Sequence, residues 1–210
     1  TAYDLPGFGP IGSLAAVTGL DALGQACESL WSVGGTDASR DLARRGGTEI
    51  GGSITQSARE ACPAARERMM IGAHLAGRAI DISKTTLCHA LSYAMTQRYG
   101  VPHGHAVALT LGAVGEVNAG VGIDGCIDPR GPADVSRRVA EATGFFGARP
   151  ETAVDEMRRL LRRLHLATTL AEAGIPRGDL RRLARAVDPV RMSNNPRRID
   201  ESGVLAILER

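Results

Sequence analysis

Residues 106–114 have the sequence Ala-Val-Ala-Leu-Thr-Leu-Gly-Ala-Val, which is apolar on almost every face of a helix. A helix with apolar side chains all round is typically buried in the centre of a domain. On both sides of this segment apolar residues recur at helical spacing, and no segment shows the alternation of a half-buried strand. The sequence therefore predicts an all-α protein, a helical bundle in which this helix is buried.

The other helices are predicted from their capping and breaking residues. We expect Thr18 to cap a helix that ends near Trp31, and a second helix over about 36–45. Four glycines in Gly46–Ser53 predict a loop or a frayed helix end. The remaining expected segments are an irregular lead-in over 1–14 and helices over 57–80 (Pro63 at a start or kink), 83–99 (capped by Ser83), 101–119, 132–144, 150–166, 177–187 and 199–209 (capped by Asp200). Residues 15–210 then form one helical domain.

Composition excludes several classes of function. Of the 210 residues, 43% are apolar and 23% charged, with a net charge of +2, so no strong basic field is available to hold nucleic acid. Aromatic residues make up only 3%, which disfavours base stacking. The arginine-rich segment 157–164 has acidic residues in the turns before it, and a solvated helix face is favoured over a nucleic-acid helix.

The cysteines and the hydropathy pattern bear on the compartment. Four cysteines are scattered without CxxC spacing, which indicates reduced thiols rather than a zinc knuckle or a redox motif. No run of 18 apolar residues exists, so we expect no transmembrane helix and no membrane partner. These features predict a cytoplasmic protein.

Two histidines are candidates for chemistry because each lies near a predicted helix start. His89 and His103 are fourteen residues apart, and a Gly-Val-Pro turn between their helices would allow the imidazoles to converge. A metal needs neutral ligands from elements that meet. Spacing alone leaves open whether these are ligands or two unrelated histidines.

Acidic and amide side chains share one face of the first helix. Asp21 and Gln25 are four residues apart, and Glu28 follows seven residues after Asp21. A carboxylate inside an apolar helix is costly to bury unless it meets a cation or a donor. Alternatively, Asp21 lies in the first helical turn and interacts favourably with the helix dipole.

Three ordered motifs together resemble a known family. Gly19-Leu-Asp-Ala-Leu-Gly-Gln-Ala-Cys-Glu-Ser is similar to the Asp-Ala-Leu-x-His-Ala-x-Glu helix of the iron-containing (group III) alcohol dehydrogenases. His89, and His103 within Pro102-His-Gly, resemble the other two ligand motifs of that family. The resemblance covers residues 15–118 well and continues weakly to Arg210.

This resemblance implies the C-terminal helical domain of a two-domain enzyme, with Asp21, His89 and His103 as ligands of Fe²⁺ or Zn²⁺. Gln25 stands where the family usually has a histidine ligand, which weakens the site and makes zinc more secure than iron. In the family an N-terminal α/β domain binds NAD(P)H, and no Gly-rich phosphate loop occurs in this chain. Reduction would therefore need NAD(P)H from a nucleotide-binding domain.

Within the family, Ser83-Lys-Thr-Thr, the segment from Tyr99 and Asn194-Asn-Pro-Arg look most like the phosphonoacetaldehyde reductase branch. This implies a small aldehyde substrate that carries a phosphonate. The remaining candidates are the substrate-binding residues Lys84, Thr85 and Thr86 at a helix start, Arg197 or Arg198 as further anion ligands, and Tyr93 and Lys84 as catalytic groups.

Two of these candidates have plain alternatives. Tyr93 is equally compatible with a core tyrosine, and Lys84, the only lysine, with a solvated cap residue.

Three hypotheses for the function stay open at this point. The first is the metal-binding domain of an alcohol dehydrogenase or aldehyde reductase. The second is a stand-alone domain that performs non-redox carbonyl or phosphonate chemistry, and the third is a non-catalytic partner protein. We expect a homodimer or an association with a nucleotide-binding domain, because a face covered in relatives would otherwise be exposed.

Overall fold

The computed structural model describes residues 11–60 and 62–210, and within them the fold is helical. Of the irregular lead-in expected over 1–14, residues 1–10 lie outside the described residues, and the prediction was wrong for residues 11–14, which are helical. The helices are α1 (Ile11–Trp31), α2 (Asp37–Gly51), α3 (Ile54–Arg59), α4 (Pro63–Ser83), α5 (Leu87–Tyr99), α6 (His103–Ala119), α7 (Pro132–Gly144), η1 (Pro150–Thr152), α8 (Ala153–Arg163), η2 (Arg177–Asp179), α9 (Leu180–Arg185), α10 (Pro189–Met192) and α11 (Glu201–Leu208).

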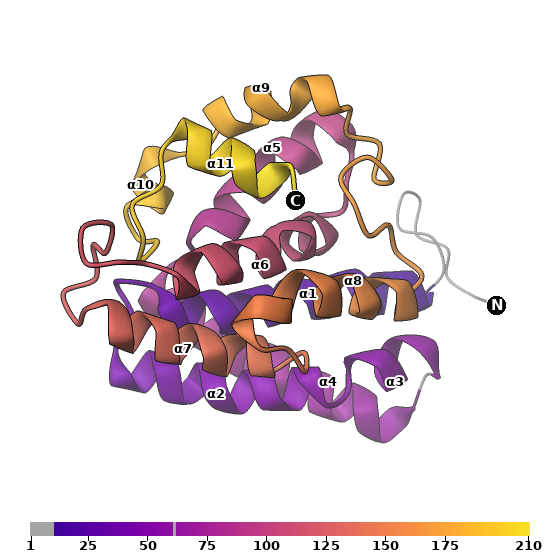
Figure 1. Ribbon diagram of the computed structural model, residues 1–210. Helices are drawn as coiled ribbons and strands as arrows, with labels where there is room; N and C mark the ends of the chain where they lie inside the picture. Colours follow the sequence, from indigo (N-terminus) through magenta and orange to yellow (C-terminus); the bar gives the residue numbers. More distant parts are fainter. Residues whose placement is uncertain (1–10, 61) are drawn as a thin grey trace.

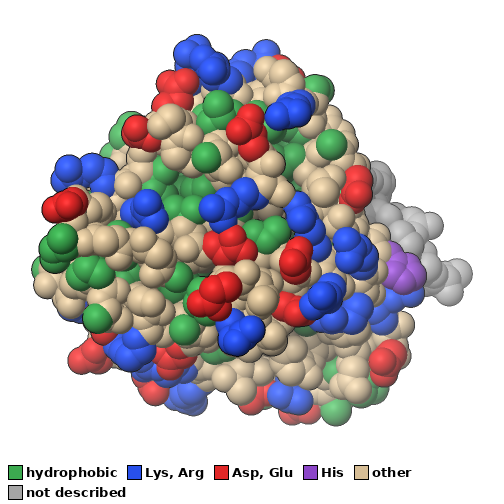
Figure 2. Space-filling view, in the orientation of Figure 1, with side chains coloured by type: hydrophobic (Ala, Val, Ile, Leu, Met, Phe, Trp, Pro, Cys, Tyr) green, Lys and Arg blue, Asp and Glu red, His purple; other side chains and the backbone are tan. Residues whose placement is uncertain are grey.

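The all-α prediction is confirmed. Strands are missing from the described residues, in which only an isolated bridge joins Cys126 to Arg197. None of the described helices is long and apolar enough to cross a membrane. Figure 2 shows acidic and basic side chains interspersed over one face of the molecule, in keeping with the small net charge.

Helix α1 is the centre of the packing. It contacts α2, α3 and α4, and it also contacts α6 and α7. In Figure 1 the first four helices form the lower part of the view, and α9, α10 and α11 lie near α5 at the top. Helix α6 is buried as expected, and Val107, Ala108, Leu111 and Val114 are all fully buried in it.

The predicted loop over Gly46–Ser53 was wrong, because α2 continues to Gly51. These glycines allow close packing rather than breaking the helix. A Cβ on Gly46 would lie 2.9 Å from the carbonyl oxygen of Gly72 on α4, and one on Gly47 would lie 2.3 Å from the ring of Phe145. Tertiary packing here outweighs the low helix propensity of glycine.

Some predicted helix ends also shifted. Thr18 lies inside α1, where its hydroxyl donates to the carbonyl of Leu14. Pro63 is the first residue of α4, and the residues before it form the separate helix α3. Ser83 ends α4 instead of capping α5, whose N-cap is Thr86. Asp200 caps α11 as predicted, since its carboxylate accepts from the backbone N–H of Gly203.

The backbone carbonyl groups at the C-terminal end of α1 accept hydrogen bonds from arginines in a distant part of the chain. Arg138 donates to the carbonyl of Leu30 (2.9 Å), and Arg130 donates to that of Val33 (2.7 Å). Both guanidinium groups pair with Asp128, at 2.5 Å from Arg138 and 2.8 Å from Arg130. Burial alone would raise the pKa of Asp128, but these two partners lower it to about 2. This network fixes α7 against the end of α1.

A second group of hydrogen bonds joins the C-terminal segment to the turn between α4 and α5. The side-chain amide of Asn194 donates to the carbonyls of Ser83, Lys84 and Thr85, and its oxygen accepts from the N–H of Gly34. Lys84 has a φ of 60°, a left-handed conformation that is unfavourable for a residue with a side chain. The three bonds from Asn194 hold the turn in this conformation.

Candidate metal centre

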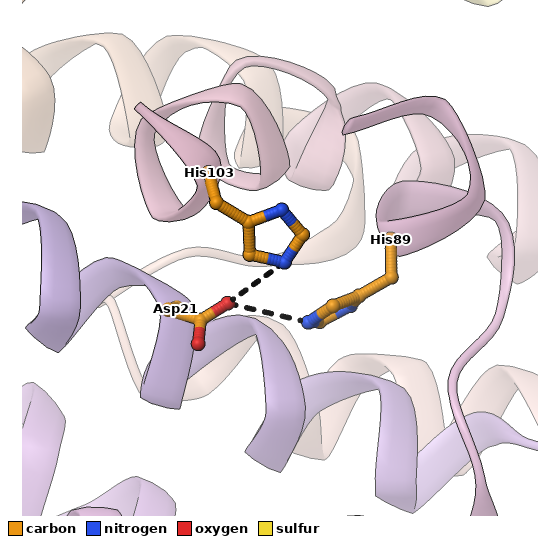
Figure 3. A group of neighbouring side chains, drawn as sticks. All are labelled: Asp21, His89 and His103. Atoms are coloured by element: carbon orange, nitrogen blue, oxygen red, sulfur yellow. Dashed lines mark ion pairs between the residues drawn. The ribbon is translucent and has the colours of Figure 1, made fainter. Parts of the chain in front are cut away.

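Three helices bring one carboxylate and two imidazoles together. Asp21 comes from α1, His89 from α5 and His103 from α6, and the three side chains point toward one another (Figure 3). The Nε2 atoms of His89 and His103 each lie 3.4 Å from Oδ1 of Asp21. The possible ligand atoms of the three residues lie within 4.8 Å of one another.

Two glycines permit this convergence. A Cβ on Gly104, next to His103, would lie 1.9 Å from the carbonyl oxygen of Val17 on α1. A Cβ on Gly24 would lie 2.4 Å from the side chain of Val107 on α6. Helices α1 and α6 can therefore approach closely enough to place His103 beside Asp21.

His89 is oriented by a fully buried carboxylate. Oε2 of Glu28 lies 2.7 Å from Nδ1 of His89 and also accepts from the N–H of Thr86 at 2.8 Å. Its other oxygen accepts from the N–H of Cys88 at 2.7 Å. Glu28 thus satisfies the first turn of α5 and holds the ring of His89 through Nδ1, which leaves Nε2 for a ligand. Such carboxylate–histidine pairs are the usual support of metal-binding imidazoles.

His103 has a corresponding support. The hydroxyl of Ser92 donates to the carbonyl of His89 at 2.7 Å and lies 3.2 Å from Nδ1 of His103. Because its one hydrogen is used, the hydroxyl accepts from Nδ1, and the lone pair of His103 then stands on Nε2. Both imidazoles therefore present the same nitrogen to Asp21.

The centre fits a divalent cation. Oδ1 of Asp21 and Nε2 of His89 are buried and have no hydrogen-bond partner within the described part of the chain. Unpaired buried polar atoms are costly, and a cation shared by them removes that cost. One carboxylate and two imidazoles form the mixed O and N donor set that Zn²⁺ and Fe²⁺ accept.

The charges around the centre set its protonation. Burial lowers the pKa of His89, but Glu28 and Asp21 outweigh it and raise that pKa to about 9. Burial and the neighbouring His89 lower the pKa of His103, although Asp21 opposes this shift. Burial would raise the pKa of Glu28, yet His89 and the N–H of Thr86 keep it below its ordinary value. A metal therefore competes with one proton on His89 and none on His103 at neutral pH.

Gln25 lies beside the centre. Its amide nitrogen donates to Oδ2 of Asp21 at 3.0 Å, so it positions the carboxylate in this arrangement. The amide then leaves Oδ1 directed at the two imidazoles.

Tyr93 lies next to this centre, and an arginine that the sequence analysis missed lies against it. The rings of Tyr93 and His103 have centroids 5.3 Å apart. The guanidinium carbon of Arg191 lies 4.7 Å from the centroid of the Tyr93 ring. Arg191 is in α10, far along the sequence from α5, and no motif marked it.

The predicted anion-binding residues are engaged elsewhere. The N–H of Thr86 is bound by Glu28, so the start of α5 already has its anion. Nζ of Lys84 contacts Asp81, and Thr85 accepts from Arg191 through its hydroxyl. Arg197 donates to the carbonyl of Val117 at 2.7 Å and bridges segments of the fold.

The described residues thus form an all-α domain in which three helices bring together one carboxylate and two imidazoles, a donor set that suits a divalent metal. The family profile described as "Fe-containing alcohol dehydrogenase family, C-terminal" matches residues 15–210. The chain therefore belongs to the Fe-containing alcohol dehydrogenase family.

Individual relatives agree with this assignment. A phosphonoacetaldehyde reductase from Streptomyces viridochromogenes is 35% identical over 94% of this chain and 50% of its own length. A sulfoacetaldehyde reductase from Bilophila wadsworthia is 30% identical over 96% of this chain and 52% of its own length. The crystal structure of sulfoacetaldehyde reductase from Bifidobacterium kashiwanohense in complex with NAD⁺ has a TM-score of 0.77 at 26% identity, covering 93% of this chain and 49% of that one. The chain spans about half the length of these relatives.

Proposed function

We propose that this chain is the metal-binding half of an aldehyde reductase or alcohol dehydrogenase that acts on a small aldehyde bearing a phosphonate or a similar anion. The observation that carries this proposal is the convergence of Asp21, His89 and His103, where two buried atoms have no hydrogen-bond partner among the described residues. The substrate class is suggested by the two relatives named above, whose names denote aldehydes with a phosphonate or a sulfonate group.

In this proposal each residue of the candidate centre has a separate role. Asp21, His89 and His103 would hold the divalent metal, Fe²⁺ or Zn²⁺, while Glu28 and Ser92 fix the two imidazoles. When bound, the metal supplies a Lewis acid for the carbonyl, and NAD(P)H from a nucleotide-binding domain supplies the hydride. Tyr93 bounds the space beside His103 and is the candidate donor to the substrate oxygen. Because Lys84 and Arg197 have protein partners, the proposal gives neither of them a role in the reaction.

Metal content tests the proposal. The purified chain, loaded with Zn²⁺ or Fe²⁺ and dialysed, should retain close to one metal per chain by inductively coupled plasma mass spectrometry. His89→Ala should lose it, and His74→Ala should keep it, because His74 is an exposed histidine on α4. Equal metal content in the wild type and His89→Ala, or no metal in the wild type, would contradict the proposal and favour the non-redox or non-catalytic alternatives.

A further inference from the structure

Arg191 is held beside the metal centre by contacts from two segments. Helix α10 packs against α5, and the guanidinium of Arg191 lies over the ring of Tyr93. Its Nη1 donates to Oγ1 of Thr85 at 2.6 Å, and Nε lies 3.7 Å from Asp188. Arg191 therefore has a fixed position before any substrate arrives.

The guanidinium retains capacity to bind a ligand. Of its three nitrogens, Nη2 has no hydrogen-bond partner among residues 11–60 and 62–210. Its side chain is 37% exposed, whereas the imidazole of His89 is 3% exposed. A planar guanidinium with free donors matches the oxygens of a tetrahedral anion better than any other side chain.

Arg191 also lies at a short distance from the site of chemistry. The Tyr93 ring lies between Arg191 and the candidate ligand His103. The guanidinium carbon is 4.7 Å from the centroid of the Tyr93 ring, and that centroid is 5.3 Å from the centroid of the His103 ring. A molecule that touches both Arg191 and the three donors must be short.

We propose that Arg191 is the specificity-determining residue that binds the anionic end of the substrate, a phosphonate or sulfonate, while the carbonyl end lies at Asp21, His89 and His103. This inference rests on the proposed function and adds to it the residue that selects the substrate. Tyr93 supports the guanidinium by a cation–π contact, and Thr85 fixes its orientation. Neutral aldehydes of the same shape lack the partner for Arg191 and bind more weakly.

The test compares an anionic ligand with a neutral one of the same shape. We would titrate the Zn²⁺-loaded chain with 2-hydroxyethylphosphonate and with 3,3-dimethyl-1-butanol, in which a tert-butyl group replaces the phosphonate, and follow binding by calorimetry. The wild type should bind the phosphonate about tenfold or more tightly, as expected for a charge-assisted contact. Arg191→Gln should lose this preference, and Arg191→Lys should keep part of it. Arg159→Gln removes an exposed arginine on α8 and should change nothing.

A second arm separates this inference from the proposed function. Methylphosphonate is titrated without metal, and the metal content of each variant is measured in parallel. Binding of methylphosphonate that Arg191→Gln abolishes would support the anion site even if the wild type holds no metal, in which case only the proposed function fails. A phosphonate preference that survives in Arg191→Gln, or a wild type that prefers neither ligand, would overturn the role of Arg191.

Discussion

Replacing Glu28 by Gln tests whether this buried carboxylate prepares His89 for a metal. An amide retains one acceptor oxygen but places an NH₂ group at the other position. If that group replaces Oε2, it faces the N–H of Thr86 and Nδ1 of His89, which now lie 2.8 and 2.7 Å from the carboxylate. His89 can relieve the conflict at Nδ1 only by giving up the proton there and keeping the one on Nε2, the nitrogen that faces Asp21.

The substitution should lower both the free energy of unfolding and the affinity for Zn²⁺. Two charge-assisted hydrogen bonds are lost, each worth about 1.5–3 kcal/mol, so the free energy of unfolding should fall by about 3–6 kcal/mol. The affinity for Zn²⁺ should fall by about 10- to 100-fold, the usual effect of losing the support behind a ligating histidine. The free energy of unfolding of a whole domain is only about 5–15 kcal/mol, so the measurements need low temperature and a stabilising buffer.

The assay is a competition titration with a chromophoric zinc chelator, next to urea denaturation followed by circular dichroism. Glu116→Gln is the matched control, because Glu116 pairs with Arg210 at the surface and, within the described residues, has no hydrogen bond or ion pair to Asp21, His89 or His103. Ser92→Ala is a milder second variant, which removes the acceptor for Nδ1 of His103 and the donor to the carbonyl of His89 but leaves Glu28 in place. If Glu28→Gln remains folded and binds Zn²⁺ as tightly as the wild type, Glu28 serves only to cap α5, and the argument about His89 is refuted.

Three further predictions concern affinity, pH and stability. Gln25→His should raise the affinity for Zn²⁺ by about tenfold or more in the same competition titration, because an imidazole is a better ligand than an amide. Metal affinity should rise about tenfold per pH unit between pH 6 and 8, because the pKa of His89, raised to about 9, means that the metal must displace a proton; a flat profile would contradict this. The pKa of Asp128 is lowered to about 2, so its contribution to stability is present above about pH 4 and is lost as the pH falls toward 2. Asp128→Asn should therefore lower the free energy of unfolding by about 3–5 kcal/mol at neutral pH, because it leaves Arg138 buried without its carboxylate. A free energy of unfolding from urea denaturation within about 1 kcal/mol of the wild type would refute this.

Much of the fold was predictable because apolar periodicity and caps are local signals. The buried helix around 106–114 and the cap at Asp200 depend only on neighbouring residues, and both predictions were right. The error at Gly46–Ser53 arose because the partners of these glycines, Gly72 and Phe145, are distant in sequence. Propensity cannot show that a missing side chain is needed for two helices to touch.

The site was only partly predictable for the same reason. Asp21, His89 and His103 stand in motifs, and the structure brings them together, although their role as ligands stays a prediction. Arg191 lies in a short helix without a motif, and only the folded chain places it over Tyr93. The expected homodimer, the association with a nucleotide-binding domain and the cytoplasmic location also stay predictions.

The bonds made by Asn194 have a consequence for the order of assembly during translation. Ribosomes release α1, α5 and α6 long before residue 194, yet the turn that precedes His89 is held by the amide of Asn194. The left-handed Lys84 gains this restraint only when the C-terminal segment docks. During synthesis the three candidate donor side chains therefore emerge before the segment that restrains the turn preceding His89.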